Sequence, residues 1–194
     1  MSKGRLEAFS DGVIAILITI MVLELKVPHG TDWAALSDFL PVFSSYVLSF
    51  VFLGIYWSNH HHLFQAVKRV DGRILWANLH LLFWLSLVPF ATAWMGENPK
   101  APVPVAIYGV DLLLAGCAYF ILARLLVALH GRESTLAKAI GEDFKGIVSV
   151  VLYAAAVGFA FVRPTVSLAL YVSVAVMWLV PDRRIERILT HPEE

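Results

Sequence analysis

Six apolar stretches, separated by short polar segments, make up most of this chain. They cover residues 9–25, 39–57, 74–94, 103–126, 147–162 and 165–180. A helix needs about 20 mostly apolar residues to cross a bilayer, and only helices and closed barrels satisfy their backbone hydrogen bonds there. Of the 194 residues, 59% are hydrophobic and 15% are charged. We therefore predict an all-α membrane protein with six transmembrane helices in one domain over residues 1–194.

The distribution of basic residues predicts the orientation of these helices. The last two stretches are short, so one of them could be re-entrant, but Lys and Arg collect in cytoplasmic loops and their alternation requires all six spans. Most of the 15 basic residues lie in the N-terminal, second-loop, fourth-loop and C-terminal regions. These are Lys3, Arg5, Lys68, Arg69, Arg73, Arg124, Arg132, Lys138, Lys145, Arg183, Arg184 and Arg187. The other three loops hold Lys26, Lys100 and Arg163, one each, which predicts that both termini are cytoplasmic.

The loops and the N-terminus carry weaker signals. Basic residues precede the first apolar run, as in a signal peptide, but no small-residue cleavage site follows. We expect Asp38 to cap the second helix and residues 130–145 to allow a short interfacial helix. Cys117 is the only cysteine, so no disulfide can form within the chain.

One face of the first helix has a regular composition. Gly12, Ile16, Thr19 and Leu23 follow one another at spacings of four, three and four residues, which places them on the same side. The pattern fits an ordinary packing seam, in which small residues allow close approach and a threonine bonds its own backbone. It fits a pore lining equally well, and periodicity alone does not separate the two.

Asp11 is an ionisable residue at the threshold of this helix, and such residues indicate functional sites. It projects about 100° away from Gly12, so we expect it to meet a neighbouring helix. The predicted topology brings Trp57, residues 59–62 and Asn78 to the same membrane level. A hydrogen-bonded cluster of these groups predicts a structural anchor for the first helix, with proton sensing by the histidines as the alternative.

Other polar residues do not predict catalysis or metal binding. His60, His61 and His62 are adjacent and project about 100° apart, so they do not converge on one ion. We expect His80 and Asp111 to be satisfied polar groups between helices. Enzyme motifs such as GxSxG, HExxH and the P-loop do not occur in the sequence, which predicts that the chain is not an enzyme. The TVGYG carbonyl filter does not occur either, so side chains would have to filter any ions that pass.

Four short motifs in the first half of the chain match a known family pattern. The run R-x-x-x-F-S-D at Arg5, Phe9, Ser10 and Asp11 directly precedes the apolar first helix. The others are W-x-x-H-H at Trp57, His60 and His61, N-x-x-L-L at Asn78, Leu81 and Leu82, and P-F-x-T at Pro89, Phe90 and Thr92. Together they resemble the transmembrane protein 175 potassium channels, prokaryotic branch.

The resemblance implies a homotetramer of six-helix subunits in which each first helix lines a central pore. Eukaryotic relatives carry two six-span repeats in one chain, whereas this chain has one, so four copies are expected. The resemblance places the constriction at Ile16, Thr19 and Leu23, with Gly12 on the same face and Glu24 at the pore mouth. It assigns Arg5, Phe9, Ser10, Asp11, Trp57, His60 and Asn78 to a structural network.

The implied function is a moderately potassium-selective cation channel of a prokaryotic plasma membrane. Potassium is the permeant ion, lipid and copies of the same chain are the partners, and no cofactor, metal or nucleic acid is expected. The alternative is a cation- or proton-coupled secondary transporter that uses Asp11 and a histidine as its proton site.

Overall fold

The structure is a computed structural model that describes residues 2–131, 134, 136–137 and 144–179. Every regular element within these residues is helical. They are α1 (Lys3–Ile20), a 3₁₀ turn η1 (Met21–Glu24), α2 (Trp33–Gln65), α3 (Gly72–Glu97), α4 (Pro102–His130), α6 (Phe144–Ala160) and α7 (Pro164–Leu179). The predicted all-α membrane fold with six main helices is confirmed.

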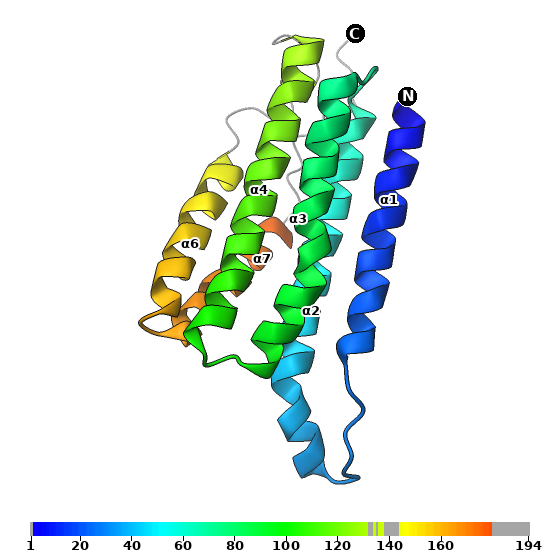
Figure 1. Cartoon of the computed structure of the whole chain (residues 1–194). Helices are drawn as coiled ribbons and strands as arrows, with labels where there is room; N and C mark the ends of the chain where they lie inside the picture. The colour runs from blue at the N-terminus through cyan, green and yellow to red at the C-terminus, as the bar shows by residue number, and fades with distance from the viewer. Residues whose placement is uncertain (1, 132–133, 135, 138–143, 180–194) are drawn as a thin grey trace.

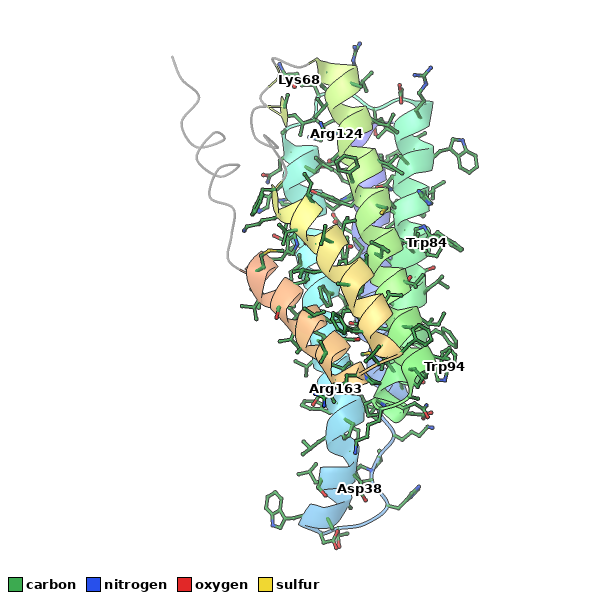
Figure 2. The ribbon with its side chains drawn as sticks, turned by 90° about the vertical axis from the view of Figure 1, so that its left-hand side faces the viewer. Asp38, Lys68, Trp84, Trp94, Arg124 and Arg163 are labelled. Atoms are coloured by element: carbon green, nitrogen blue, oxygen red, sulfur yellow. The ribbon has the colours of Figure 1, made fainter. Side chains whose placement is uncertain are left out.

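Consecutive helices run in opposite directions (Figure 1). The start of α1, the α2–α3 turn and the end of α4 share one end of the bundle, and the α3–α4 and α6–α7 turns share the other (Figure 1). Lys68 and Arg124 lie towards the first end and Arg163 towards the second (Figure 2). This is the separation of basic residues that the sequence predicts, and the C-terminal arginines lie outside the described residues.

The helices differ in length. Four helical segments among the described residues are long and apolar enough to cross a membrane. They are Lys3–Glu24, Trp33–Gln65, Gly72–Glu97 and Pro102–His130. The helices α6 and α7 have 17 and 16 residues, which gives each a length of about 25 Å at 1.5 Å per residue. They are therefore somewhat shorter than the roughly 30 Å hydrocarbon core.

Two hydrophobic cores hold the helices together, and α4 contributes to both. The first core contains residues of α1, α2, α3 and α4, such as Ile14, Leu53, Leu81 and Leu122. The second joins α2, α3, α4, α6 and α7 through residues such as Phe52, Leu112, Ala156 and Tyr171. Because α1 packs against α2 and α3 but contributes no residue to the second core, the rest of its surface is uncovered.

The outer surface of the bundle is apolar, as a lipid environment requires. Large hydrophobic side chains are exposed on α2, α3, α4, α6 and α7, for example Val47, Trp76, Ile107, Val151 and Val172. In water such a surface would be a strong aggregation site. The exposure is the expected outcome where hydrocarbon replaces water as the solvent.

The helix α2 begins earlier than the sequence predicts. Its N-cap is Asp32, whose carboxylate accepts a hydrogen bond from the backbone N–H of Ala35 at 3.0 Å, so the expectation that Asp38 caps this helix is wrong. Asp38 lies inside the helix, and the first turns of α2 project beyond the neighbouring helices (Figures 1 and 2). The predicted interfacial helix at 130–145 falls largely outside the described residues.

Candidate functional site

The helix α1 has one buried and one exposed face. Its fully or almost fully buried side chains are Leu6, Ser10, Ile14 and Leu17, and Met21 of η1 continues this face. The opposite face carries Gly12, Ile16, Thr19 and Leu23, and all four are exposed in the single chain. The exposed fractions of Ile16 and Leu23 are 59% and 79%. The face that the periodicity singles out is therefore the one that the described part of the chain does not cover.

The geometry of this face departs from a straight α-helix at its end. Leu23 lies in the 3₁₀ turn Met21–Glu24, which rotates about 20° more per residue than an α-helix. In a straight α-helix, Leu23 would point about 20° to one side of the direction of Ile16. With the 3₁₀ turn it points about 40° to the other side. Both side chains still point away from the bundle.

The hydroxyl of Thr19 is held by its own helix. It donates to the backbone carbonyl oxygens of Ala15 and Ile16, which lie 3.0 Å and 2.9 Å from Thr19 Oγ1. Since these contacts use the proton, the lone pairs of Oγ1 remain as acceptors on the exposed face. Thr19 thus supplies an oxygen, but not a donor, between two apolar side chains.

A buried hydrogen-bond chain fixes the other face of α1. Asn78 on α3 donates from Nδ2 to Ser10 Oγ at 2.9 Å, and Ser10 donates to the Leu6 carbonyl at 2.9 Å. The Asn78 Oδ1 lies 2.7 Å from His60 Nε2 on α2, and because an amide oxygen only accepts, this nitrogen donates. All three side chains are at most 1% exposed. They tie α1, α2 and α3 together at one level.

Asp11 makes a separate contact with α2. The indole Nε1 of Trp57 donates to Asp11 Oδ1 at 3.1 Å, and the Trp57 ring stacks on the His61 ring with their centroids 6.1 Å apart. Asp11 is half-buried, whereas Trp57 is 47% exposed. The partner of Asp11 on α2 is therefore the indole of Trp57 and not His60, which bonds to Asn78 instead.

Two members of the predicted network stand apart from these contacts. Arg5 is exposed, and it forms no hydrogen bond or ion pair with the part of the chain that the structure describes. Phe9 is 50% exposed. Both lie on the side of α1 that its own chain leaves uncovered.

Glu24 lies at the end of the bundle opposite to Asp11, and it is exposed. Beside it, Lys26 Nζ forms an ion pair with Glu97 Oε1 at 2.8 Å. The hydrogen bond and the charge of Glu97 raise the pKa of the Lys26 ammonium above its ordinary value, with a smaller contribution from Glu24. Glu24 thus belongs to a small group of charges at this end of α1.

Two polar residues differ from the sequence-based expectation. His80 accepts a hydrogen bond from Trp84 Nε1 at 2.9 Å, so its partner is on the same helix. Asp111 is 5% exposed, and neither of its carboxylate oxygens has a hydrogen-bond partner among the described residues. The expectation of satisfied inter-helix groups is therefore wrong for both.

Sequence reasoning also missed a second polar link. Thr92 Oγ1 lies 2.6 Å from Ser49 Oγ, and Ser49 Oγ lies 2.9 Å from Tyr108 Oη. These three buried hydroxyls join α2, α3 and α4. The signal in the sequence was a hydroxyl-bearing residue within each of three apolar stretches, but nothing in the spacing pairs them.

The described residues contain no group of three or more His, Cys, Asp or Glu side chains that could hold a metal ion. The neighbouring histidines diverge, because His60 bonds to Asn78 and His61 lies 2.8 Å from Gln65 Nε2.

Comparison with known proteins gives a consistent family. Residues 5–89 match the family model of the endosomal/lysosomal potassium channel TMEM175. This match includes the exposed face of α1 and every residue of the Ser10–Asn78–His60 chain. A protein of Chryseobacterium that is named a potassium channel is 54% identical over 97% of this chain and 98% of its own length.

More distant relatives include a potassium channel of Streptomyces collinus, 39% identical over 60% of this chain and 61% of the relative. The TMEM175 of Gallus gallus, named an endosomal/lysosomal proton channel, is 36% identical over 47% of this chain and 21% of its own length. Among solved structures, a lysosomal potassium-selective channel TMEM175 homologue from Chamaesiphon minutus matches with a TM-score of 0.79. It is 29% identical and covers 92% of this chain and 96% of its own.

Proposed function

Because this chain belongs to the TMEM175 family of potassium channels, we propose that four copies assemble around a central pore lined by α1. The observation that carries the proposal is the exposed face of Gly12, Ile16, Thr19 and Leu23, which lies opposite a face held by buried hydrogen bonds. A helix so fixed on one side presents the other side in a defined direction. Four copies of that face would enclose a pathway.

Selectivity arises from side chains on this pathway. Ile16 and Leu23 form apolar rings where ions lose part of their hydration, and hydrophobic constrictions of this kind also gate by dewetting. The oxygens of four Thr19 side chains lie between the rings and replace some of the lost water. Potassium is easier to dehydrate than sodium, so the channel is moderately potassium-selective without a carbonyl filter.

The polar contacts around α1 position the pore face and do not contact ions. Ser10, Asn78 and His60 set the depth and rotation of α1, and the Asp11–Trp57 bond restrains its cytoplasmic end. At the other end, Glu24 raises the local concentration of cations by electrostatic attraction. Arg5 and Phe9, exposed in the single chain, contact neighbouring subunits.

The protein acts in a prokaryotic plasma membrane as a single six-helix channel domain. The end of the bundle with Lys68 and Arg124 (Figure 2) faces the cytoplasm, since basic residues collect on that side. Both termini are then cytoplasmic, and Glu24 faces outward. No cofactor takes part.

Cation flux into proteoliposomes tests the pore assignment. The native chain is expected to pass potassium passively and faster than sodium. Ile16→Asn is expected to lower the potassium-to-sodium ratio, because a polar ring keeps the pathway hydrated, and Ile16→Asn with Leu23→Asn to bring it near unity. The matched control is Val172→Asn, an exposed apolar position on α7, which leaves the ratio unchanged. An unaltered ratio in the double variant contradicts the pore assignment.

The same vesicles separate the alternatives when a pH-sensitive dye is enclosed. Potassium flux that requires a proton gradient identifies a coupled transporter that uses Asp11 and a histidine. Passive proton flux in excess of potassium flux makes the proton the main permeant ion, as the names of the vertebrate relatives indicate for those proteins.

A further inference from the structure

Asp111 is an ionisable residue inside the apolar span of α4, and neither the pore face nor the hydrogen-bond chain beneath α1 includes it. It lies nine residues beyond Pro102, the first of the 29 residues of α4, which is about 14 Å along a helix of about 43 Å. Asp111 is 5% exposed. Ionisable residues at this depth in a membrane protein are rare and indicate functional sites.

The side of α4 that carries Asp111 packs against α3. Three buried residues continue this side at spacings of four, three and four: Ala115, Ala118 and Leu122. They belong to the same hydrophobic core as Leu85 and Val88 of α3. The carboxyl group is therefore on the face through which α4 contacts its neighbour α3.

The carboxyl group of Asp111 has no partner among the described residues. Both of its oxygens are buried, and neither has a hydrogen bond there. No charged side chain in the described ranges interacts electrostatically with Asp111. Two tyrosine hydroxyls lie within electrostatic range, Tyr56 on α2 and Tyr108 on α4, and a hydroxyl does not cancel a negative charge.

The other titratable groups on the surrounding helices do not compensate a charge on Asp111 either. Within the spans of α2, α3, α6 and α7 they are His80 and tyrosines, and the exposed His80 bonds to Trp84 of its own helix. The remaining ones lie within six residues of a helix end: Asp38, residues 60–62, Arg73, Glu97 and Lys145. On α4 the nearest cation is Arg124, thirteen residues or about 20 Å away.

These observations select a proton as the ligand of Asp111. A buried carboxylate without a countercharge or hydrogen bonds is so unfavourable that such a group is neutralised instead. A metal ion or an organic cation would need space beside the oxygens, and both oxygens are buried. A proton needs no such space, and the neutral acid has one O–H left to donate.

We propose that Asp111 is a proton-binding site, and that its neutral carboxylic acid forms part of the packing between α3 and α4. When the proton passes to water, the carboxylate that remains is a charge in an apolar contact. Water must then enter between the two helices to solvate it, which loosens the contact. The site thus makes the α3–α4 packing sensitive to alkaline pH.

Infrared spectroscopy detects the bound proton directly, because the C=O stretch of a neutral carboxylic acid is separate from the bands of a carboxylate. The spectra are recorded at neutral pH in a maltoside detergent, which has no ester carbonyl. The difference between the native protein and Asp111→Asn is expected to contain a neutral carboxyl band. The matched control is Asp32→Asn, at the exposed cap of α2, which should leave this band in place because a carboxyl group in water is ionised at that pH.

The pH dependence of unfolding gives an independent readout. Unfolding in mixed micelles brings Asp111 into water, where a carboxyl group is ionised above about pH 4, so unfolding releases the bound proton. Rising pH therefore favours the unfolded state. Relative to Asp111→Asn, the folded-to-unfolded ratio of the native protein is expected to fall by up to about ten-fold per pH unit. Asp32→Asn should keep the native pH dependence.

Deuterium exchange of peptides tests the effect on packing. At a pH at which the neutral carboxyl band of the native protein is lost, its α3 amides should exchange faster than those of Asp111→Asn. At neutral pH the two proteins should agree. The comparison at equal pH cancels the base catalysis of exchange, and the peptides of α7 are the internal control that should not differ.

A difference spectrum without a neutral carboxyl band at neutral pH overturns the proposal, because Asp111 is then charged and has a partner such as a buried water molecule. Parallel pH dependences of the native protein and Asp111→Asn overturn it as well. Equal exchange of α3 after loss of the band overturns the packing role. If Asp111→Asn does not elute as a folded protein in gel filtration, isotope-labelled aspartate in the native protein identifies the band, and its presence or absence decides.

Discussion

At the scale of single residues, Asn78 is the group on which the position of α1 depends. Its amide is fully buried and uses a donor towards Ser10 and an acceptor towards His60. A residue that only donates or only accepts would leave one neighbour unpaired in a low-dielectric interior, where each unpaired group is costly. Position 78 therefore requires a side chain, such as an amide, that can donate one hydrogen bond and accept another.

Asn78→Ala is accordingly expected to lower the free energy of unfolding by about 1–3 kcal/mol. The measurement is denaturation of the purified protein in mixed micelles. Asn98→Ala is the matched control, since the side chain of the exposed Asn98, the C-cap of α3, donates to the nearby Trp94 carbonyl; its effect should stay below about 0.5 kcal/mol. Equal losses in the two variants would show that the buried amide has no special role.

Asp11 and Asp111 show where sequence reasoning stops at this scale. The sequence places Asp11 next to α2, but the choice between Trp57 and a histidine depends on the register of two helices, which no local pattern encodes. For Asp111, the expectation was a satisfied polar group between helices. The structure instead leaves both carboxylate oxygens without one among the described residues.

At the scale of helices, close packing of α4 against α7 depends on a glycine. A Cβ at Gly109 would overlap the Tyr171 hydroxyl and lie 2.8 Å from its Cζ. Tyr171 has little room to move, because it donates to the Val105 carbonyl at 2.9 Å and packs between the rings of Tyr108 and Tyr153. The two helices can approach only because residue 109 has no side chain.

Gly109→Ala is therefore expected to destabilise the protein by about 1–3 kcal/mol through overpacking. Gly116→Ala, on the same helix, is the control: its Cβ would make one ordinary contact at 3.7 Å. Since alanine favours a helix over glycine by about 0.5–1 kcal/mol, this variant should be slightly more stable than the native chain. The same denaturation series measures both, and a neutral Gly109→Ala would mean that α7 shifts without cost.

The positions of the helices were predictable from long apolar runs, and their ends were less so. Asp32 and Asp38 are both acceptable caps for α2, and hydrophobicity favoured the second because the apolar run begins there. The structure uses Asp32, which adds residues 33–38 to the helix outside the expected span. That Gly12, Ile16, Thr19 and Leu23 share one face was predictable, because a period of 3.6 residues is a local property. That this face is exposed in the single chain was not.

At the scale of the whole molecule, the uncovered face of α1 predicts self-association. Native mass spectrometry in mild detergent is expected to give four copies of the chain. In a Cys117→Ser background, Leu23→Cys should oxidise to covalent dimers, because four α1 helices would bring this position together. Val172→Cys, on α7, should stay monomeric. Efficient dimers from Val172→Cys and none from Leu23→Cys would move the axis of the assembly away from α1.

The hydrogen-bond chain beneath α1 has a consequence for biosynthesis. Ser10 and Asn78 are separated by 68 positions in the sequence, so α1 enters the membrane long before its partner on α3 has been synthesised. During that interval the buried hydrogen bond between Ser10 and Asn78 cannot fix the rotation of α1. We therefore expect the first helix of a nascent subunit to take its final rotation only when the third has left the ribosome and inserted.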